Sequence, residues 1–96
     1  MNKFYVYILA SQKNGTIYIG FTNDLKRRIL DHKEKAVKGF TEKYNVTILV
    51  YFEEFENSED AILREKQLKK WKRAWKLKLI DKENSSWNDL SKEWYK

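Results

Sequence analysis

The sequence has no cysteine, no proline and a single histidine, His32. Without cysteine, the chain cannot form a disulfide framework, a thiolate metal site or a cysteine nucleophile. With one histidine, it cannot form a zinc site built from several histidines. A chain without disulfides is compatible with a reducing compartment, so we expect a cytoplasmic protein.

Long hydrophobic runs are also missing. The longest apolar run is far shorter than the roughly 20 residues that a membrane helix needs. The apolar segment at residues 5–10 is too short for a signal-peptide core and has no cleavage site after it. We therefore expect no membrane partner. A chain of 96 residues has the size of one compact domain, with no room for a separate regulatory module.

Positive charge, in contrast, is abundant and unevenly placed. The net charge is +6, and residues 64–78 alone carry +7. Such concentration is typical of proteins that bind polyanions through phosphate neutralisation, although a lysine-rich face that is merely solvated is an equally good interpretation of the charge alone. The bases of this segment are Arg64, Lys66, Lys69, Lys70, Lys72, Arg73, Lys76 and Lys78, and a smaller group consists of Lys26, Arg27, Arg28, Lys33, Lys35 and Lys38.

We expect a subset of these bases to contact nucleic acid, namely Lys26, Arg27, Arg64, Lys69, Lys70, Lys72, Arg73 and Lys76. Trp71 and Trp75 alternate with the lysines and could stack on bases. Their helical spacing favours a role as core anchors, and we predict that both are buried.

The pattern of residue types predicts an α/β (α+β) fold with the order ββαβαα. Residues 4–10, 16–20 and 46–55 are rich in β-branched and aromatic residues, as in strands, and Asn14-Gly15 predicts a hairpin between the first two. The third strand is expected at the centre of a small three-stranded antiparallel sheet. Helices are expected at 24–36, 58–72 and 74–82, capped at 22–24 and 57–60, with a polar connector at 38–43. Residues 83–96 should pack partly against the body.

Three polar residues fall on apolar helix faces. Arg28 and His32 share a stripe with the apolar residues of the first helix, and Glu65 lies on the apolar stripe of the next. An inward carboxylate and an inward guanidinium cost several kcal/mol unless they are paired or used. From these residues alone, a structural Arg28–Glu65 ion pair is slightly favoured over catalysis. His32 alone would ordinarily be a structural histidine, and Tyr7 and Tyr18 ordinary sheet tyrosines.

The order of motifs resembles the GIY-YIG nuclease superfamily. Tyr5-Val6-Tyr7, ten further residues and Tyr18-Ile19-Gly20 are similar to its signature, with Tyr5 in place of the first glycine. The spacing from Arg28 to His32, the run Arg64-Glu65-Lys66 and a late asparagine, Asn84, are also similar to those of the superfamily. The resemblance covers roughly residues 4–90 and is strongest to a small single-domain subgroup, so we treat 1–96 as one GIY-YIG-like domain.

The resemblance implies a metal-dependent endonuclease, a hydrolase acting on DNA, and assigns five residues to its site. Glu65 would bind one Mg²⁺ or Mn²⁺ ion, with water filling most of its shell. Arg28 would brace the phosphate, and Tyr7 would activate water beside Tyr18. His32 would relay a proton or orient its neighbours. Gly20 would let substrate approach the backbone, and the role of Asn84 is the least defined.

We expect these five side chains, Tyr7, Tyr18, Arg28, His32 and Glu65, to line one concave surface. Two alternatives to an endonuclease remain open at this point. The chain could be a catalytically inactive nucleic-acid-binding domain that keeps the fold and the basic helix. It could also be a protein-interaction module that uses residues 66–78 as a basic amphipathic surface.

Overall fold

The computed structural model describes residues 2–36 and 39–96 and confirms the predicted ββαβαα order. One short helix, α2, was not predicted and lies where a polar connector was expected. The elements are β1 (Phe4–Ala10), β2 (Ile17–Thr22), α1 (Leu25–Lys33), α2 (Phe40–Tyr44), β3 (Ile48–Phe55), α3 (Ser58–Lys70) and α4 (Arg73–Glu83).

The three strands form an antiparallel sheet in the order β2-β1-β3. β1 is therefore the central strand, and the prediction that β3 is central was wrong. The physical reason lies in the two sequences. Residues 6–10 of β1 are all buried, whereas β3 ends in residues that include Glu53 and Glu54, which suit a sheet edge.

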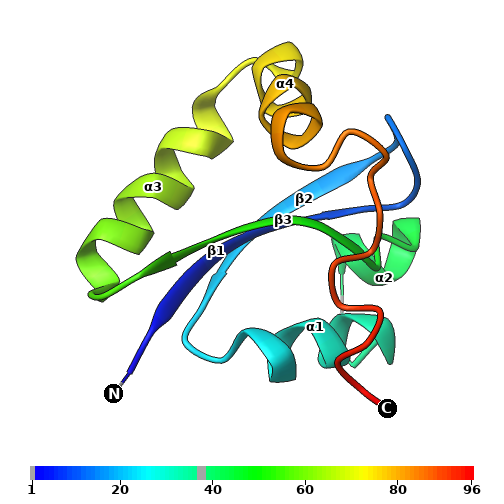
Figure 1. Cartoon of the computed structure of the whole chain (residues 1–96), viewed down its shortest axis with the longest axis horizontal. Helices are drawn as coiled ribbons and strands as arrows, with labels where there is room; N and C mark the ends of the chain where they lie inside the picture. The colour runs from blue at the N-terminus through cyan, green and yellow to red at the C-terminus, as the bar shows by residue number, and fades with distance from the viewer. Residues whose placement is uncertain (1, 37–38) are drawn as a thin grey trace.

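Helices cover both faces of the sheet (Figure 1). α3 and α4 lie on one face, over a core that includes Val6 and Ile8. α1 lies on the other face, where Tyr7 and Leu9 of the same strand point. Alternate residues of β1 thus enter two separate cores, as the period of a strand requires. No helix within residues 2–36 and 39–96 has the length and apolarity needed to cross a membrane.

The predicted N-terminal caps of α1 and α3 are both confirmed. The Asp24 side chain accepts a hydrogen bond from the Arg27 backbone N–H at 3.2 Å, and Asn57 accepts one from Asp60 N–H at 2.9 Å. Asp24 is thus the cap of α1 itself rather than an acid in its first turn. α1 also ends earlier than expected, because Lys35 adopts a left-handed conformation with φ of 57°.

The hairpin between β1 and β2 is wider than a two-residue turn. Residues 11–16 form the loop, which the Ser11 N–H closes by donating to the Thr16 carbonyl oxygen at 3.0 Å. Asn14 has a positive φ of 59°, while Gly15 does not. Asn14-Gly15 therefore marked the hairpin correctly, with only the asparagine in the left-handed region.

The C-terminal segment, residues 84–96, packs against the body as predicted. It runs from the α4 side of the sheet to the α1 side (Figure 1). Trp87 is buried, and its indole N–H donates to Asp81 at 2.7 Å. Lys33 of α1 forms an ion pair with Asp89 at 2.6 Å, which ties the segment to the helix that carries His32.

Candidate active site

A phenol and an imidazole meet in the core beneath α1. The Tyr7 hydroxyl lies 3.0 Å from His32 Nε2, and His32 Nδ1 lies 2.9 Å from the Thr41 hydroxyl oxygen. Both the tyrosine and the histidine are almost fully buried. The imidazole is therefore held at both nitrogens, which sets the position and orientation of the ring.

Gly20 makes room for this phenol. It pairs with Tyr7 across β1 and β2, and a Cβ atom added at Gly20 would overlap Cζ and the hydroxyl oxygen of the tyrosine. The place above the glycine is thus occupied by the Tyr7 ring. We predicted that Gly20 would let substrate approach the backbone. In the structure, its lack of a side chain makes room for the Tyr7 ring instead.

Tyr18 joins this pair from the next strand. Its ring centroid lies 5.5 Å from that of His32 and 6.4 Å from that of Tyr7. On its other side, the Phe40 ring lies at 6.3 Å and is followed by Tyr44 at 4.8 Å from Phe40. The aromatic series therefore runs from the buried pair to the surface, where Phe40 and Tyr44 are about half exposed.

Sequence reasoning missed the contribution of α2. Phe40, Thr41 and Tyr44 all belong to this helix, which has five residues and no side-chain cap. So short a helix looks like a connector, because it has too few residues for a periodic apolar pattern. The available signal was the pair of aromatic residues four apart, Phe40 and Tyr44, beside a threonine.

The protonation states follow from burial. Desolvation raises the pKa of Tyr7 well above its usual range, and the Tyr18 and Glu65 charges add to this while Arg28 opposes it. Desolvation, assisted by the Arg28 charge, lowers the pKa of His32 below 6.5. Near neutral pH, the phenol is thus protonated and the imidazole is neutral, so one ring nitrogen of His32 donates a hydrogen bond to its hydroxyl partner and the other accepts one.

Arg28 and Glu65 are placed differently from the prediction. Arg28 is exposed rather than inward, since Leu25, Ile29 and His32 alone form the buried stripe of α1. The predicted Arg28–Glu65 ion pair is absent from the described part of the chain. Glu65 pairs instead with Lys69, one turn later, at 3.2 Å.

Of the five predicted site residues, the structure thus brings three into contact: Tyr7, Tyr18 and His32. Glu65 belongs to α3, which lies on the opposite face of the sheet from α1 (Figure 1). The charges of Arg28 and Glu65 nevertheless both act on the Tyr7 phenol. β2 is an edge strand of the sheet, next to both faces.

A pocket of about 310 Å³ lies along that edge. Tyr18 and Phe40 line it from the aromatic side, and Lys69 and Lys76 line it from α3 and α4. Ile17 and Ile19 complete the wall. The pocket therefore joins the aromatic cluster to the basic segment, and its two lysines would attract an anion.

Not all bases of the predicted nucleic-acid surface are available. Arg64 is held by Glu53 at 3.0 Å and lies over the Trp71 ring at 5.2 Å. Arg73 donates to the carbonyl oxygens of the β1–β2 loop, and Arg27 pairs with Asp31. Within the described residues, no ion pair or side-chain hydrogen bond involves the side chains of Lys26, Lys70 or Lys72, and Lys38 lies outside the described residues.

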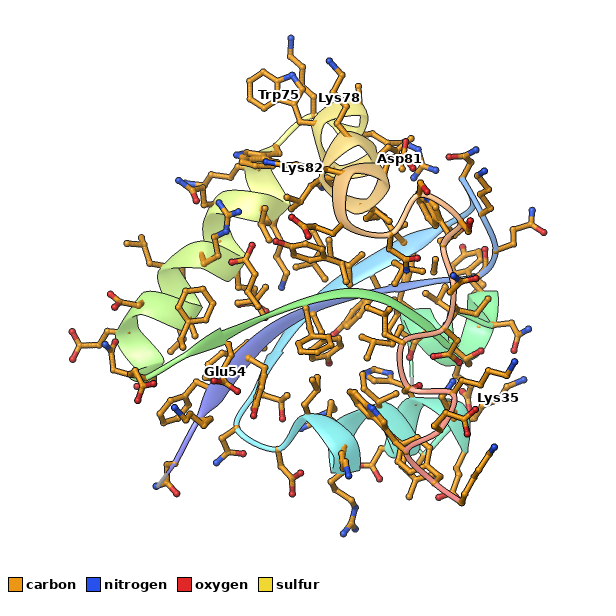
Figure 2. The ribbon with its side chains drawn as sticks, viewed as in Figure 1. Lys35, Glu54, Trp75, Lys78, Asp81 and Lys82 are labelled. Atoms are coloured by element: carbon orange, nitrogen blue, oxygen red, sulfur yellow. The ribbon has the colours of Figure 1, made fainter. Side chains whose placement is uncertain are left out.

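The two tryptophans of the basic segment differ. Trp71 is partly buried against the core, as predicted. The prediction for Trp75 was wrong, because this side chain is 53% exposed and points away from the body together with Lys78 (Figure 2). The break between α3 and α4 at residues 71–72 changes the helix direction, so helical spacing across it does not hold.

Asn84 has a structural role. It caps the C-terminus of α4, its amide nitrogen donates to the Val50 and Asn88 carbonyl oxygens at 3.0 and 2.9 Å, and its amide oxygen accepts from the Asn88 N–H. The bond to Val50 fixes the C-terminal segment to β3, and the two bonds with Asn88 close a turn within that segment. No donor or acceptor of this side chain is left for a substrate beyond the second lone pair of its oxygen.

The donor set fits a divalent ion only in part. In residues 2–36 and 39–96, no group of three or more histidine, cysteine, aspartate or glutamate side chains gathers in one place. The Glu65 side chain is 18% exposed, and its lysine partner is half exposed, so the ion pair between them is weak. Glu65 therefore fits as one oxygen ligand of an ion such as Mg²⁺, with water and substrate phosphate supplying the others.

Comparison with known proteins shows the family of the chain. A family model described as the GIY-YIG catalytic domain matches residues 3–78. A UPF0213 protein of Clostridium perfringens is 39% identical over 93% of this chain and 95% of its own length. One of Staphylococcus saprophyticus is 36% identical over 83% of this chain and 96% of its own. The solution NMR structure of a UPF0213 protein from Bacillus halodurans matches with a TM-score of 0.58 at 30% identity, covering 95% of this chain and 96% of that one.

Proposed function

The chain belongs to the GIY-YIG family of catalytic domains, and from this premise we propose that it is a metal-dependent endonuclease cleaving phosphodiester bonds of DNA. The observation that carries the proposal is the hydrogen bond between the Tyr7 hydroxyl and His32 Nε2, next to a pocket that Lys69 and Lys76 line. A buried, neutral phenol–imidazole pair stabilises a fold no better than apolar packing would. Beside a phosphate-attracting pocket, it suits proton transfer.

The pair can act as a relay. A water molecule bound at the Tyr7 hydroxyl gives its proton to the phenol oxygen as the phenol proton passes to His32 Nε2. The phenol thus remains neutral throughout, which suits its raised pKa. The imidazolium formed would later return the proton, through the same hydroxyl, to the oxygen that leaves phosphorus.

Thr41 completes the relay. In this relay Nε2 accepts from Tyr7, so the proton of the neutral imidazole resides on Nδ1 and is donated to the Thr41 hydroxyl oxygen, 2.9 Å away. The same hydrogen bond remains in the imidazolium. Thr41 is therefore a positioning residue for His32.

Charge stabilisation would come from three groups. The exposed Arg28 guanidinium is not engaged by any acid of the described chain and could form two parallel hydrogen bonds to phosphate oxygens. Lys76 would hold the neighbouring phosphate across the β2 edge. A divalent ion held by Glu65, water and the substrate would act as a Lewis acid on the scissile phosphate.

A cleavage assay tests the proposal. Single-stranded, duplex, flapped and branched DNAs would be incubated with Mg²⁺ or Mn²⁺ and with wild type, Glu65→Ala or Glu83→Ala. Glu83 is an exposed helical glutamate and serves as the matched control. We expect cleavage by wild type and Glu83→Ala that is lost in Glu65→Ala and in chelator. Equal cleavage activity of wild type and the two variants would contradict the assignment of Glu65.

A non-catalytic nucleic-acid-binding domain is the second candidate. The ion pair between Glu65 and Lys69 favours it, because this pair neutralises the one carboxylate assigned to the ion. In that case, DNA would bind with the salt dependence expected of phosphate contacts, and no DNA of the panel would be cut with either metal.

A further inference from the structure

Another cavity lies away from the candidate active site. It has a volume of about 530 Å³ and lies between the outer end of the sheet, the start of α1 and the C-terminal segment. Tyr5, Phe52 and Trp94 form its aromatic walls, and Leu25 contributes to the apolar lining. We call this cavity the aromatic pocket. Neither the relay nor the basic segment uses it.

The three rings are arranged as adjacent walls rather than as a stack. Tyr5 and Phe52 meet edge to face with centroids 6.4 Å apart, and Phe52 and Trp94 do so at 6.0 Å. Successive rings that are close to perpendicular present several π faces to one space, which is the geometry that recognises cations. Within residues 2–36 and 39–96, no lysine or arginine lies over any of these rings.

Carboxylates complete the pocket. Glu54, on the α1 side of β3, accepts a hydrogen bond from the Tyr5 hydroxyl at 3.2 Å and is half exposed (Figure 2). Asp24 borders the pocket at the cap of α1, where its charge offsets the positive end of the helix. Lys3 and Lys26 also border the pocket, and the Lys3 ammonium lies 2.5 Å from a Glu56 oxygen and 3.7 Å from a Glu54 oxygen, so Glu54 is only its more distant partner.

The local potential is consistent with a site for positive charge. Burial and the hydrogen bond to Glu54 raise the pKa of Tyr5, and the charges of Glu54 and Asp24 raise it further, while Lys3 opposes them. Glu54 therefore acts on this hydroxyl both as a hydrogen-bond acceptor and as a charge, as a counter-ion in the pocket would.

We propose that the aromatic pocket formed by Tyr5, Phe52 and Trp94 binds an organic cation, an alkylated ammonium or a guanidinium group, with Glu54 as its counter-ion. The rings would contact the apolar shell of the cation through their faces, and Glu54 would compensate the charge at one end. The cation could be a free small molecule or a side chain of a partner protein. The chemistry of recognition is the same for both.

The test uses choline and its neutral isostere, 3,3-dimethyl-1-butanol, titrated into the ¹⁵N-labelled full chain and followed by NMR. We expect saturable shifts of the Trp94 indole N–H and the Glu54 amide, with choline binding roughly twofold to thirtyfold more tightly than the isostere. A titration with N-acetyl-arginine amide identifies the source, because tighter binding of this probe than of choline would indicate a protein side chain. Equal affinity of choline and its isostere, or the absence of saturable shifts with both cations, would overturn the proposal.

Two variants keep the test informative. Phe52→Leu removes a ring wall but keeps an apolar side chain, and Glu54→Gln removes the counter-ion without touching the core. Both should weaken choline binding severalfold. Glu83→Gln is the matched control, since it removes the same charge from an exposed side chain outside the pocket lining and should leave the affinity unchanged. An effect of Glu83→Gln as large as that of Glu54→Gln would reduce the proposal to a general charge effect and contradict it.

Discussion

Tyr7 and Gly20 are directly paired neighbours on β1 and β2, and the ring of the tyrosine occupies the space that a side chain at position 20 would need. The tyrosine of the first signature motif thus depends sterically on the glycine of the second. This relation links the two motifs physically, because the glycine sets the position from which the phenol reaches His32.

Gly20→Ala should therefore destabilise the protein by about 1–3 kcal/mol through overpacking against the phenol. It should also displace the phenol from His32 and reduce cleavage. In a Tyr7→Ala background, the same change should cost much less, because the ring is gone. Thermal unfolding of the four variants of this double-mutant cycle measures the coupling, and additive effects would contradict the steric relation.

Thr41→Val tests the far side of the relay. The substitution keeps the shape and leaves His32 Nδ1 without its partner in a buried site, so stability should fall by about 1–3 kcal/mol. Cleavage should fall as well, since the imidazole loses one of the two hydrogen bonds that orient it. Thr47→Val, at a partly buried threonine of the same segment, is the control and should change both quantities little. Equal behaviour of the two variants in denaturant titrations would remove Thr41 from the site.

The lowered pKa of His32 predicts a loss of stability in weak acid. Above pH 6.5 the histidine is neutral in both states, so its contribution is fully present. As the pH falls below 6.5, the unfolded chain takes up a proton that the folded chain resists, and stability decreases until the lower folded pKa is passed. Melting temperatures between pH 7.5 and 4.5 should therefore fall more steeply for wild type than for His32→Gln. Parallel curves would mean that burial does not disfavour the charged imidazole.

The basic segment should dominate the salt dependence of DNA binding. Replacing Lys69, Lys70 and Lys72 by alanine should flatten the slope of log K against log salt by up to about 3 units. Alanine at Lys13, Lys82 and Lys92, three exposed lysines elsewhere, is the control set and should flatten it less. Fluorescence anisotropy at several salt concentrations measures both. An unchanged slope for the first set would move the binding surface to the basic group at residues 26–38.

The sequence predicted the elements well, because caps such as Asn57 and apolar runs such as residues 4–10 are local signals. It failed where a position depends on distant partners. The central strand is decided by pairing, which Glu53 and Glu54 indicated only by their polarity. Trp75 became exposed because the chain changes direction just before it.

The candidate site was predictable to the same degree. Tyr7, Tyr18 and His32 meet because they extend from adjacent strands and the helix packed on them. Arg28 lies beside the buried stripe of α1 rather than on it. A step of one residue along a helix is enough to turn a side chain from the buried face to the exposed face. Thr41 was missed because a five-residue helix gives no periodic signal.

Glu65→Gln separates catalysis from structure at the one carboxylate assigned to the ion. A buried pair with Arg28 would have made this change cost roughly 3–5 kcal/mol, since it strands a guanidinium. The observed partner is Lys69, whose side chain is half exposed, and pairs of this kind contribute about 0–1 kcal/mol. The glutamine variant should therefore melt within a few degrees of wild type and still bind DNA, while metal-dependent cleavage disappears. A collapse of its melting temperature would show that Glu65 is structural. Retained cleavage with an unchanged melt would show that the carboxylate holds no ion, because glutamine is uncharged and is a much weaker ligand for Mg²⁺.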